Sequence, residues 1–561
     1  MAFAEPAAPV FGRALGRSAL ICLLALLAMS GLVAQGAGRP AASIRAESGT
    51  TADLQAAVDR AAPGDTVIIP AGTWDVTDTV RLSDGIHIRG EGRDKTVLKR
   101  SEVQRRWRSM FRIDASTGEP FTFSHLTLAS VARKLLAAGD RDAIDRGIEI
   151  NGKCAGFRVH HCRFTGFTHA AVFVNGRGGE RKGHATGVVD NNEFIDIFYT
   201  DPGKMSLGYG VAVIGAPDEW SVRLGQPDAV FVEDNYFERC RHSVTSNGGS
   251  RYVFRYNTVQ DNYYPFAAVD THGKLLHEHG SRSCEVYKNT FSGGINFRDG
   301  KMRGTWALGI RGGDGVVFGN SFNDVWCPIC LVVEGGIENR SHPVPDQVTD
   351  MWLWDNLHNG EPLARINAGV HDEQTAFFQE GRDYHFEKKP GYAPHTYPHP
   401  LRTPEPVTPA PEDAFPRNGS FDSGRRYWDI EVSDRNEGLF AVEDGALLLR
   451  RAQGDCVVAA WQDVPVEAGA HYALEYRLKV EGTGSGGVSV AFGGPDGSWI
   501  EGADVHGPQR GSTDWRDEVI RFPVPAEAGR IRISLSVTPG DVSAWFDDIR
   551  LKRAAPPETG G

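Results

Sequence analysis

The sequence predicts an all-β protein in which a parallel β-helix is followed by an antiparallel β-sandwich. Short apolar strands recur across residues 186–336, and they are separated by turns of a common Asn-x-apolar type, at Asn192-Glu193-Phe194, Asn235-Tyr236-Phe237, Asn257-Thr258-Val259, Asn289-Thr290-Phe291 and Asn320-Ser321-Phe322. Self-similarity at a period of a few tens of residues, with no helical pattern between the strands, indicates stacked β coils. After a Pro-rich stretch, evenly spaced strands with turn signals indicate a separate sandwich.

The first residues have the pattern of an export signal. Arg13 and Arg17 precede an apolar stretch over 18–33 and then small residues, so we expect residues 1–37 to be a signal peptide that is removed. The formal charge of −12 becomes −13 when two Arg and one Glu leave with this segment. Such an acidic protein is not expected to bind nucleic acid. We therefore expect a secreted, soluble monomer with no membrane association after cleavage.

The β-helix is expected over residues 45–389. A helix over 51–62 should cap its open end, and the strand at 66–72 should begin the first coil. Insertions such as 201–226 interrupt the period, and the coils should end near 356–360. Residues 390–416 contain nine Pro in twenty-seven positions, which predicts a stiff, extended linker before a sandwich over 417–553.

Seven Cys remain after signal cleavage, and they are too dispersed for a disulfide framework. Cys327 and Cys330 form a Cys-x-x-Cys motif inside a predicted coil, which indicates a local disulfide or two packed thiols.

Aligning the coils on the Gly that closes each strand separates two faces, because strand side chains alternate. The residue four positions before that Gly is aliphatic in every coil and is expected to point inward. These residues form a ladder of Val172, Val211, Val244, Val269, Leu308 and Leu331. One residue before it is an outward polar row of Asn247, His272, Arg311 and Glu334, with Asp270 on the same face as His272.

The outward row is either an ordinary solvated face or a reactive site. A carboxylate near His272 can fix its tautomer and raise its basicity. Arg311 and Arg241 offer planar forks for a carboxylate. A base, an acid and a cation are the groups that remove a proton beside a uronate carboxylate.

Several further residues are candidates with plainer alternatives. His242 has inward parity, which favours a buried histidine, although a bend at the strand start could turn it outward. Lys274 and Arg282 lie on a polar loop that either closes over a substrate or is simply solvated. Tyr264 is a possible proton donor or sugar-stacking ring, or a ring packed at a turn.

The segment 62–72 and the coils to about residue 360 resemble the pectate-lyase-like superfamily of right-handed parallel β-helices. The resemblance implies an extracellular enzyme that acts on polysaccharides, often uronates, by lyase, hydrolase or epimerase chemistry. Asp270-Thr271-His272 is similar to the Asp-x-His motif of mannuronan epimerases, which has Pro in place of Thr271 and Tyr in place of Ala267. The acidic calcium cluster of pectate lyases is not recognisable.

The C-terminal segment resembles jelly-roll carbohydrate-binding modules through Asn418-Gly419-Ser420-Phe421-Asp422 and Phe546-Asp547-Asp548-Ile549. The resemblance implies a structural calcium near Asp422 and Asp548. Trp461 and Trp499 are candidate sugar platforms, or core residues.

The leading hypothesis is a secreted lyase that cleaves a uronate-containing polysaccharide by β-elimination and requires no cofactor for catalysis. His272 would be the base or orient it, Asp270 would tune His272, and Arg311 and Arg241 would neutralise the substrate carboxylate. The alternatives are an inverting hydrolase using Asp270 and Glu334, a uronate epimerase, and a glycan-binding surface protein without catalysis.

Overall fold

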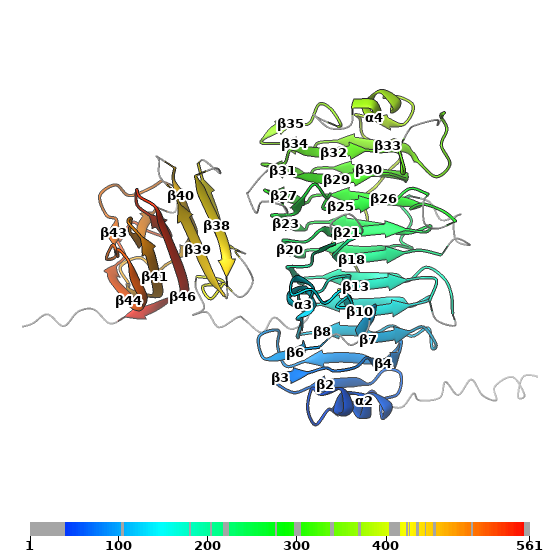
Figure 1. Cartoon of the computed structure of the whole chain (residues 1–561), viewed down its shortest axis with the longest axis horizontal. Helices are drawn as coiled ribbons and strands as arrows, with labels where there is room; N and C mark the ends of the chain where they lie inside the picture. The colour runs from blue at the N-terminus through cyan, green and yellow to red at the C-terminus, as the bar shows by residue number, and fades with distance from the viewer. Residues whose placement is uncertain are drawn as a thin grey trace, which may run out of the picture. The chain divides into compact units, whose positions relative to one another are not determined.

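A parallel β-helix and a β-sandwich make up the protein (Figure 1). The computed structural model describes residues 40–102, 106–178, 181–201, 205–216, 224–274, 278–296, 305–336, 341–367, 372–402, 416–421, 425, 427–433, 437–443, 445–452, 456–494 and 498–554. The predicted signal peptide lies outside this part of the chain. Among the described helices, none has the length and apolar character to cross a membrane.

Three sheets run along the β-helix, and the coils from β2 to β32 contribute one strand to each of them. Sheet A contains, in spatial order, β1 (Ser43–Arg45), β2 (Thr66–Ile69), β5 (His87–Gly90), β8 (Thr122–Ser124), β11 (Ala155–His160), β14 (Thr186–Asp190), β19 (Val230–Glu233), β22 (Arg251–Arg255), β26 (Ser283–Tyr287), β30 (Gly313–Phe318), β33 (Val348–Trp354) and β36 (Tyr384–His385). Sheet B contains β3 (Gly72–Asp75), β6 (Thr96–Arg100), β9 (Thr127–Ser130), β12 (Arg163–Thr165), β15 (Glu193–Ile195), β20 (Tyr236–Glu238), β23 (Thr258–Gln260), β27 (Thr290–Ser292), β31 (Ser321–Asn323), β34 (Leu357–His358) and β35 (Glu361–Pro362). Sheet C contains β4 (Val80–Ser83), β7 (Arg108–Asp114), β10 (Asp145–Asn151), β13 (Ala170–Asn175), β18 (Tyr209–Ile214), β21 (His242–Asn247), β25 (Val269–Thr271), β29 (Trp306–Ile310) and β32 (Cys327–Leu331).

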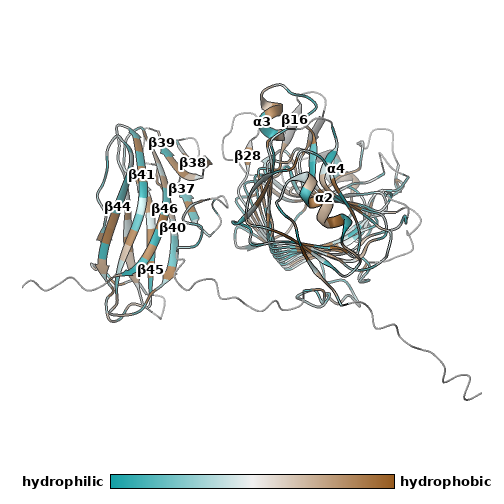
Figure 2. Ribbon diagram, turned by 90° about the horizontal axis from the view of Figure 1, so that it is seen from below, coloured by the Kyte–Doolittle hydropathy of each residue, from teal (hydrophilic) through white to brown (hydrophobic). Residues whose placement is uncertain are grey.

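The described helices and short ribbons lie at the ends of the stack or between coils. They are α2 (Thr51–Asp59), α3 (Ala132–Ala137), α4 (Asp372–Phe377), the antiparallel pair β16 (Tyr199–Asp201) and β17 (Met205–Leu207), and the parallel pair β24 (Tyr263–Tyr264) and β28 (Ile295–Asn296). The view along the stack in Figure 2 shows α2 across one opening. Leu54, Ala57 and Val58 are its buried residues, as expected for a cap that closes the core.

The repeated Asn residues form a ladder inside the turns. The amide of Asn235 donates to Oδ1 of Asn257 at 3.1 Å, and Asn257 donates to Asn289 at the same distance. The residues just before these Asn, such as Asp234 and Tyr256, have a positive φ that tightens the turn. Each coil therefore satisfies the buried polar groups of the next, which explains why the sequence repeats Asn at this position.

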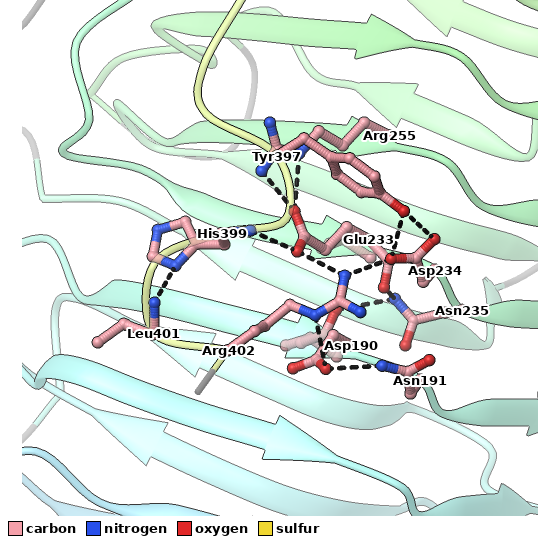
Figure 3. Close-up of polar contacts among 12 residues, drawn as sticks. Asp190, Asn191, Glu233, Asp234, Asn235, Arg255, Tyr397, His399, Leu401 and Arg402 are labelled. Carbon is pink, nitrogen blue, oxygen red and sulfur yellow. Dashed lines mark hydrogen bonds and ion pairs between the residues drawn. The ribbon is translucent and has the colours of Figure 1, made fainter. Parts of the chain in front are cut away.

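The first part of the predicted linker is not a free spacer. Residues 391–402 lie against the outer face of sheet A, and Figure 3 shows Tyr397, His399 and Arg402 of this segment beside Glu233 and Asp234. Arg255 also donates to the Thr396 carbonyl at 2.8 Å. Arg402 contacts Glu233 at 2.8 Å, and the Tyr397 hydroxyl donates to Asp234. These ionic contacts correct the expectation of an extended spacer from residue 390. Residues 403–415 lie outside the described part of the chain.

Two antiparallel sheets form the C-terminal sandwich. Sheet D contains β37 (Asp429–Val432), β40 (Val458–Pro465), β45 (Arg530–Val537), β42 (Gly486–Gly493) and β43 (Val505–His506), and sheet E contains β38 (Gly438–Glu443), β39 (Ala446–Arg451), β46 (Val542–Ala554), β41 (His471–Gly482) and β44 (Thr513–Pro523). Alternating residues such as Leu474, Tyr476 and Leu478 fill the core between the two sheets.

Candidate active site on the outer face of sheet C

The inward ladder of sheet C confirms most of the predicted alignment of the coils. Val172, Val211 and Val244 are in register on neighbouring strands, and Val244 is followed by Val269 and Leu308. The last coil is shifted by two residues, because Leu308 pairs with Ile329 and not with Leu331. The prediction that Glu334 is in strand register with Arg311 is therefore wrong. Glu334 follows β32, and its side chain reaches back from there.

A bulge at the start of β21 turns His242 outward, which corrects its predicted inward parity. The N–H groups of Ser243 and Val244 both donate to the Ala268 carbonyl, at 2.7 and 3.2 Å. Two donors on one carbonyl indicate an extra residue in the strand. The same irregularity occurs at Gly210 in the preceding coil, where an added Cβ would meet the core residue Phe237 at 2.6 Å. The residue before each bulge, Tyr209 or His242, therefore faces outward.

Arg311 joins two carboxylates at the centre of this face. Its Nη2 donates to both oxygens of Asp270 at 2.7 Å, and its Nη1 donates to Glu334 at 2.7 Å. The Asp270 side chain is 5% exposed, whereas that of Arg311 is 23% exposed. Asp270 and Glu334 thus lie together although one is on β25 and the other follows β32.

His272 lies between the same two carboxylates. Its Nε2 is 2.9 Å from Asp270 Oδ2, and its Nδ1 is 3.1 Å from Glu334 Oε2. Burial favours the neutral ring, but Asp270 and Glu334 outweigh burial and raise the pKa of His272 above 6.5. Arg311 Nη2 lies 2.7 Å from His272 Nε2. When His272 is charged, both nitrogens carry hydrogens and repel each other, but the Asp270 carboxylate contacts both and offsets this repulsion.

Both carboxylates are held in the ionised form. Burial alone would raise the pKa of Asp270, but Arg311, His272 and His242 keep it well below its usual range. Burial likewise opposes ionisation of Glu334, and the hydrogen bond from His272 and the charge of Arg311 lower its pKa. The cluster therefore contains two acceptors and one acid, the His272 imidazolium.

His242 is held in the opposite state. Burial and the neighbouring Arg241 lower the pKa of His242 to about 3. Its Nδ1 contacts the Ala267 carbonyl, which assigns the proton to Nδ1 and leaves Nε2 unprotonated. Nε2 is 3.3 Å from Asp270 Oδ2 without the alignment of a hydrogen bond. Two histidines on neighbouring strands thus have pKa values moved apart, an arrangement typical of acid and base pairs.

Tyr209 and Arg241 complete the cluster. The Tyr209 ring stacks on His242 with a centroid distance of 5.7 Å. Burial lowers the pKa of Arg311, but Asp270 and Glu334 outweigh burial and raise it, and Tyr209 adds a smaller increase. The Arg241 guanidinium lies over the Phe266 ring at 4.7 Å, and its Nε and Nη1 are buried and make no hydrogen bond to any residue that the structure describes. A buried charge without a partner is costly unless an anion compensates it.

The other predicted residues of the β-helix do not join the cluster. Asn247 ends β21 and accepts the Gly248 N–H at 2.7 Å. Arg282 pairs with Asp314 of sheet A at 2.9 Å. Lys274 is exposed on the loop after β25, and Tyr264 lies on the small ribbon β24, with a side chain outside the described ones. Cys327 and Cys330 are buried free thiols that pack together, one of the two expected outcomes.

The sandwich places its two predicted tryptophans on one face of sheet D. The Arg532 guanidinium lies 5.4 Å from the Trp461 ring and 4.7 Å from the Trp499 ring. Asp548 accepts from Arg550 at 2.9 Å, and Asp422 lies outside the described residues. Within the described part of the chain, no group of three His, Cys, Asp or Glu is placed to hold a metal ion.

Sequence reasoning missed Tyr209, because the strand was assumed to alternate without a bulge. The available signal was Gly210 directly after it, since Gly inside a strand pattern often marks a bulge.

No protein-family model matches the sequence, and no curated protein matches it. The enzymatically active domain of tailspike protein 4 from bacteriophage CBA120 is similar over 90% of this chain and 66% of that one, at 10% identity and a TM-score of 0.29. A CBM4 structure matches 24% of this chain and 99% of its own, at 19% identity and a TM-score of 0.20. TmCBM61 in complex with β-1,4-galactotriose matches 25% of this chain and 97% of its own, at 19% identity and a TM-score of 0.20. Because these TM-scores are low, we infer nothing about the reaction from them.

Proposed function

We propose that this protein is a secreted lyase that cleaves a uronate-containing polysaccharide by β-elimination. The observation that carries the proposal is the position of His272 on the outer face of sheet C, where its Nε2 lies 2.9 Å from Asp270 and its Nδ1 lies 3.1 Å from Glu334. Next to it are a neutral histidine and a guanidinium without a full set of partners. These are the acid, the base and the cation that the reaction needs.

The substrate carboxylate is assigned to Arg241. Arg311 is already engaged by Asp270 and Glu334, so its role is positioning: it keeps both carboxylates ionised, and they in turn keep His272 charged. The sequence hypothesis assigned both Arg311 and Arg241 to the substrate carboxylate, and made His272 the base or the residue that orients it. The raised pKa of His272 instead supports the role of proton donor.

The base is assigned to the stacked pair of Tyr209 and His242. Nε2 of His242 makes no hydrogen bond to the described residues, and the Tyr209 ring stacks on the His242 ring from the neighbouring strand. In the proposed step the base takes the proton from C5 of the uronate, and the C–H electrons form the C4=C5 double bond. The bond from C4 to the glycosidic oxygen breaks, and His272 gives its proton to that oxygen. Arg241 stabilises the negative charge that develops on the carboxylate.

A hydrolase with Asp270 and Glu334 is disfavoured by the same electrostatics. An inverting glycosidase needs one protonated carboxyl group as its acid. Here Arg311 and His272 lower the pKa of both carboxylates against the opposing effect of burial. An epimerase would use the same acid and base but return the proton to C5 without cleavage.

The sandwich is proposed to bind the same polysaccharide through the face of Trp461 and Trp499. The Arg532 guanidinium contacts both rings and is itself paired with Asp463 at 2.6 Å, so the face is proposed to bind sugar rings mainly by stacking on the indoles. A structural calcium near Asp548, and a monomeric state, remain parts of the proposal.

The test is product analysis on a panel of uronate polymers by mass spectrometry and NMR. The lyase yields oligosaccharides with unsaturated ends, one water lighter than hydrolysis products. Saturated fragments would indicate the hydrolase, and a changed sugar configuration without cleavage would indicate the epimerase. Binding without any of these products would indicate a glycan-binding protein. His272→Gln should abolish turnover, while Arg282→Gln, in an ion pair on sheet A, should not.

A further inference from the structure

A continuous row of rings runs along the outer face of sheet C, away from the His272 cluster. From His242 it passes to Tyr209 at 5.7 Å, then to His169 at 5.5 Å, and then to Trp107 at 4.8 Å. His242 and Tyr209 lie on β21 and β18, His169 directly precedes β13, and Trp107 directly precedes β7. It therefore follows the direction in which coils are stacked.

Trp107 ends the row in an unusual state. It is 40% exposed, and its φ of +66° is a conformation that a bulky side chain seldom adopts. Its N–H donates to the Ile144 carbonyl at 2.6 Å, which holds this backbone in place. An exposed indole kept in a strained conformation points to a function for the ring.

Arg146 contacts both Trp107 and the side chains around it. The Arg146 guanidinium lies 4.2 Å from the centre of the Phe173 ring and 5.9 Å from that of Trp107. Its Nε donates to His169 Nδ1 at 2.8 Å, and its Nη1 donates to Glu149 at 2.9 Å. Burial, together with the charge of Arg146, holds the pKa of His169 well below 6.5, so the ring is neutral and accepts this bond.

We propose that Trp107 and Arg146 form a distal subsite for the same acidic polysaccharide chain that the His272 cluster cleaves. The inference rests on the proposed function. In sheet C, the strand of Arg146 is four steps from the strand of Asp270, and the strand that follows Trp107 is five steps away. At about 4.8 Å a step these are roughly 19 and 24 Å. One sugar in an extended chain is about as long as one step, so the subsite holds a residue about four to five sugars from the cleaved bond.

The occupant is assigned from continuity and chemistry. The row of rings joins this place to the cluster without a break, which suits a chain that lies along the stack. The indole offers a flat apolar surface for a sugar ring, and Arg146, whose bonds to His169 and Glu149 use Nε and Nη1, offers Nη2 to the sugar carboxylate. The protein should therefore prefer long chains over short ones.

The test compares Trp107→Ala with the unaltered protein on a uronate polymer and on trisaccharides of the same sugar. The variant should raise KM for the polymer at least about tenfold, the effect of losing an aromatic hot spot. It should leave kcat, and the kinetics on trisaccharides, unchanged. Trp107→Phe should recover most of the loss.

The matched control is Trp352→Ala, which removes a tryptophan of sheet A that also carries a cation, Lys389 at 4.9 Å. It should change neither substrate's kinetics. Equal effects of Trp107→Ala on long and short substrates, or none on either, would overturn the subsite while leaving the proposed lyase intact. Calorimetric binding of the polymer to His272→Gln, with and without Trp107→Ala, tests the subsite without turnover. Absence of turnover by the unaltered protein would overturn the lyase instead.

Discussion

Replacing Arg311 with alanine should destabilise the β-helix and inactivate the protein together. The substitution removes three charge-assisted hydrogen bonds of 2.7 Å and leaves Asp270 and Glu334 without their shared cation. Breaking a buried ion pair by removing one partner costs about 3–5 kcal/mol. Because Arg311 is 23% exposed and His272 still faces both carboxylates, we expect the lower end, about 3 kcal/mol.

Thermal unfolding followed by circular dichroism measures this loss. In domains of moderate size, 1 kcal/mol shifts Tm by about 2–4 °C, so we expect a decrease of about 6–12 °C. The triple variant Arg311→Ala, Asp270→Asn, Glu334→Gln removes the stranded charges and should recover part of that decrease without recovering activity. If the triple variant is less stable than Arg311→Ala alone, uncompensated charge is not the cause of the destabilisation.

Three further predictions concern the acid, the base and the fold. Activity should fall as the pH rises through the raised pKa of His272, because only the charged ring donates a proton; the stability it contributes is fully present below about pH 6.5 and is lost over the same alkaline range. A pH–rate profile and unfolding at several pH values measure both effects, and a profile that increases through this range would contradict the acid role. His242→Gln and Tyr209→Phe should each be assayed, and the one that removes the base should lower kcat about 10²–10⁴-fold with an unchanged Tm; wild-type kcat in both variants would exclude this pair. Asn257→Ala should lower the free energy of unfolding by about 3 kcal/mol, since it leaves the Asn235 N–H and the Val232 carbonyl of the ladder unpaired, and a Tm equal to that of wild type would refute the ladder as a stabilising feature.

The fold could be predicted because the sequence repeats a physical requirement. From Asn192 to Asn356, each coil uses a buried Asn to satisfy the backbone of a neighbouring turn, so Asn235, Asn257 and Asn289 recur at the same position. The inward Val and Leu positions recur for the same reason, since each faces its counterpart one strand away. A periodic constraint of this kind is visible in a single sequence.

The candidate site could be predicted only where strict alternation holds. The outward positions of Asp270 and Arg311 could be predicted because β25 and β29 pair in unbroken register up to Thr271 and Ile310, so their side chains alternate strictly. His242 and Tyr209 were misplaced or missed because a bulge reverses the parity at the start of the strand. The register of Glu334 was wrong because the last coil is shorter than the alignment assumed.

The protonation states could not be predicted from the strand pattern. They depend on which carboxylate lies within about 3 Å of which ring nitrogen, a matter of side-chain geometry. Two histidines that look alike in the sequence therefore reach opposite states. His272 gains Asp270 and Glu334 as partners, whereas His242 gains a carbonyl and a neighbouring arginine.

The most direct test of the proposed lyase is the ultraviolet absorbance of unsaturated uronate ends during incubation with uronate polymers. The unaltered protein should produce a steady increase on at least one polymer, and His272→Gln, at equal concentration and with an unchanged fold, should produce none. Cleavage without any increase in absorbance, or an undiminished increase with His272→Gln, would contradict β-elimination with His272 as the proton donor.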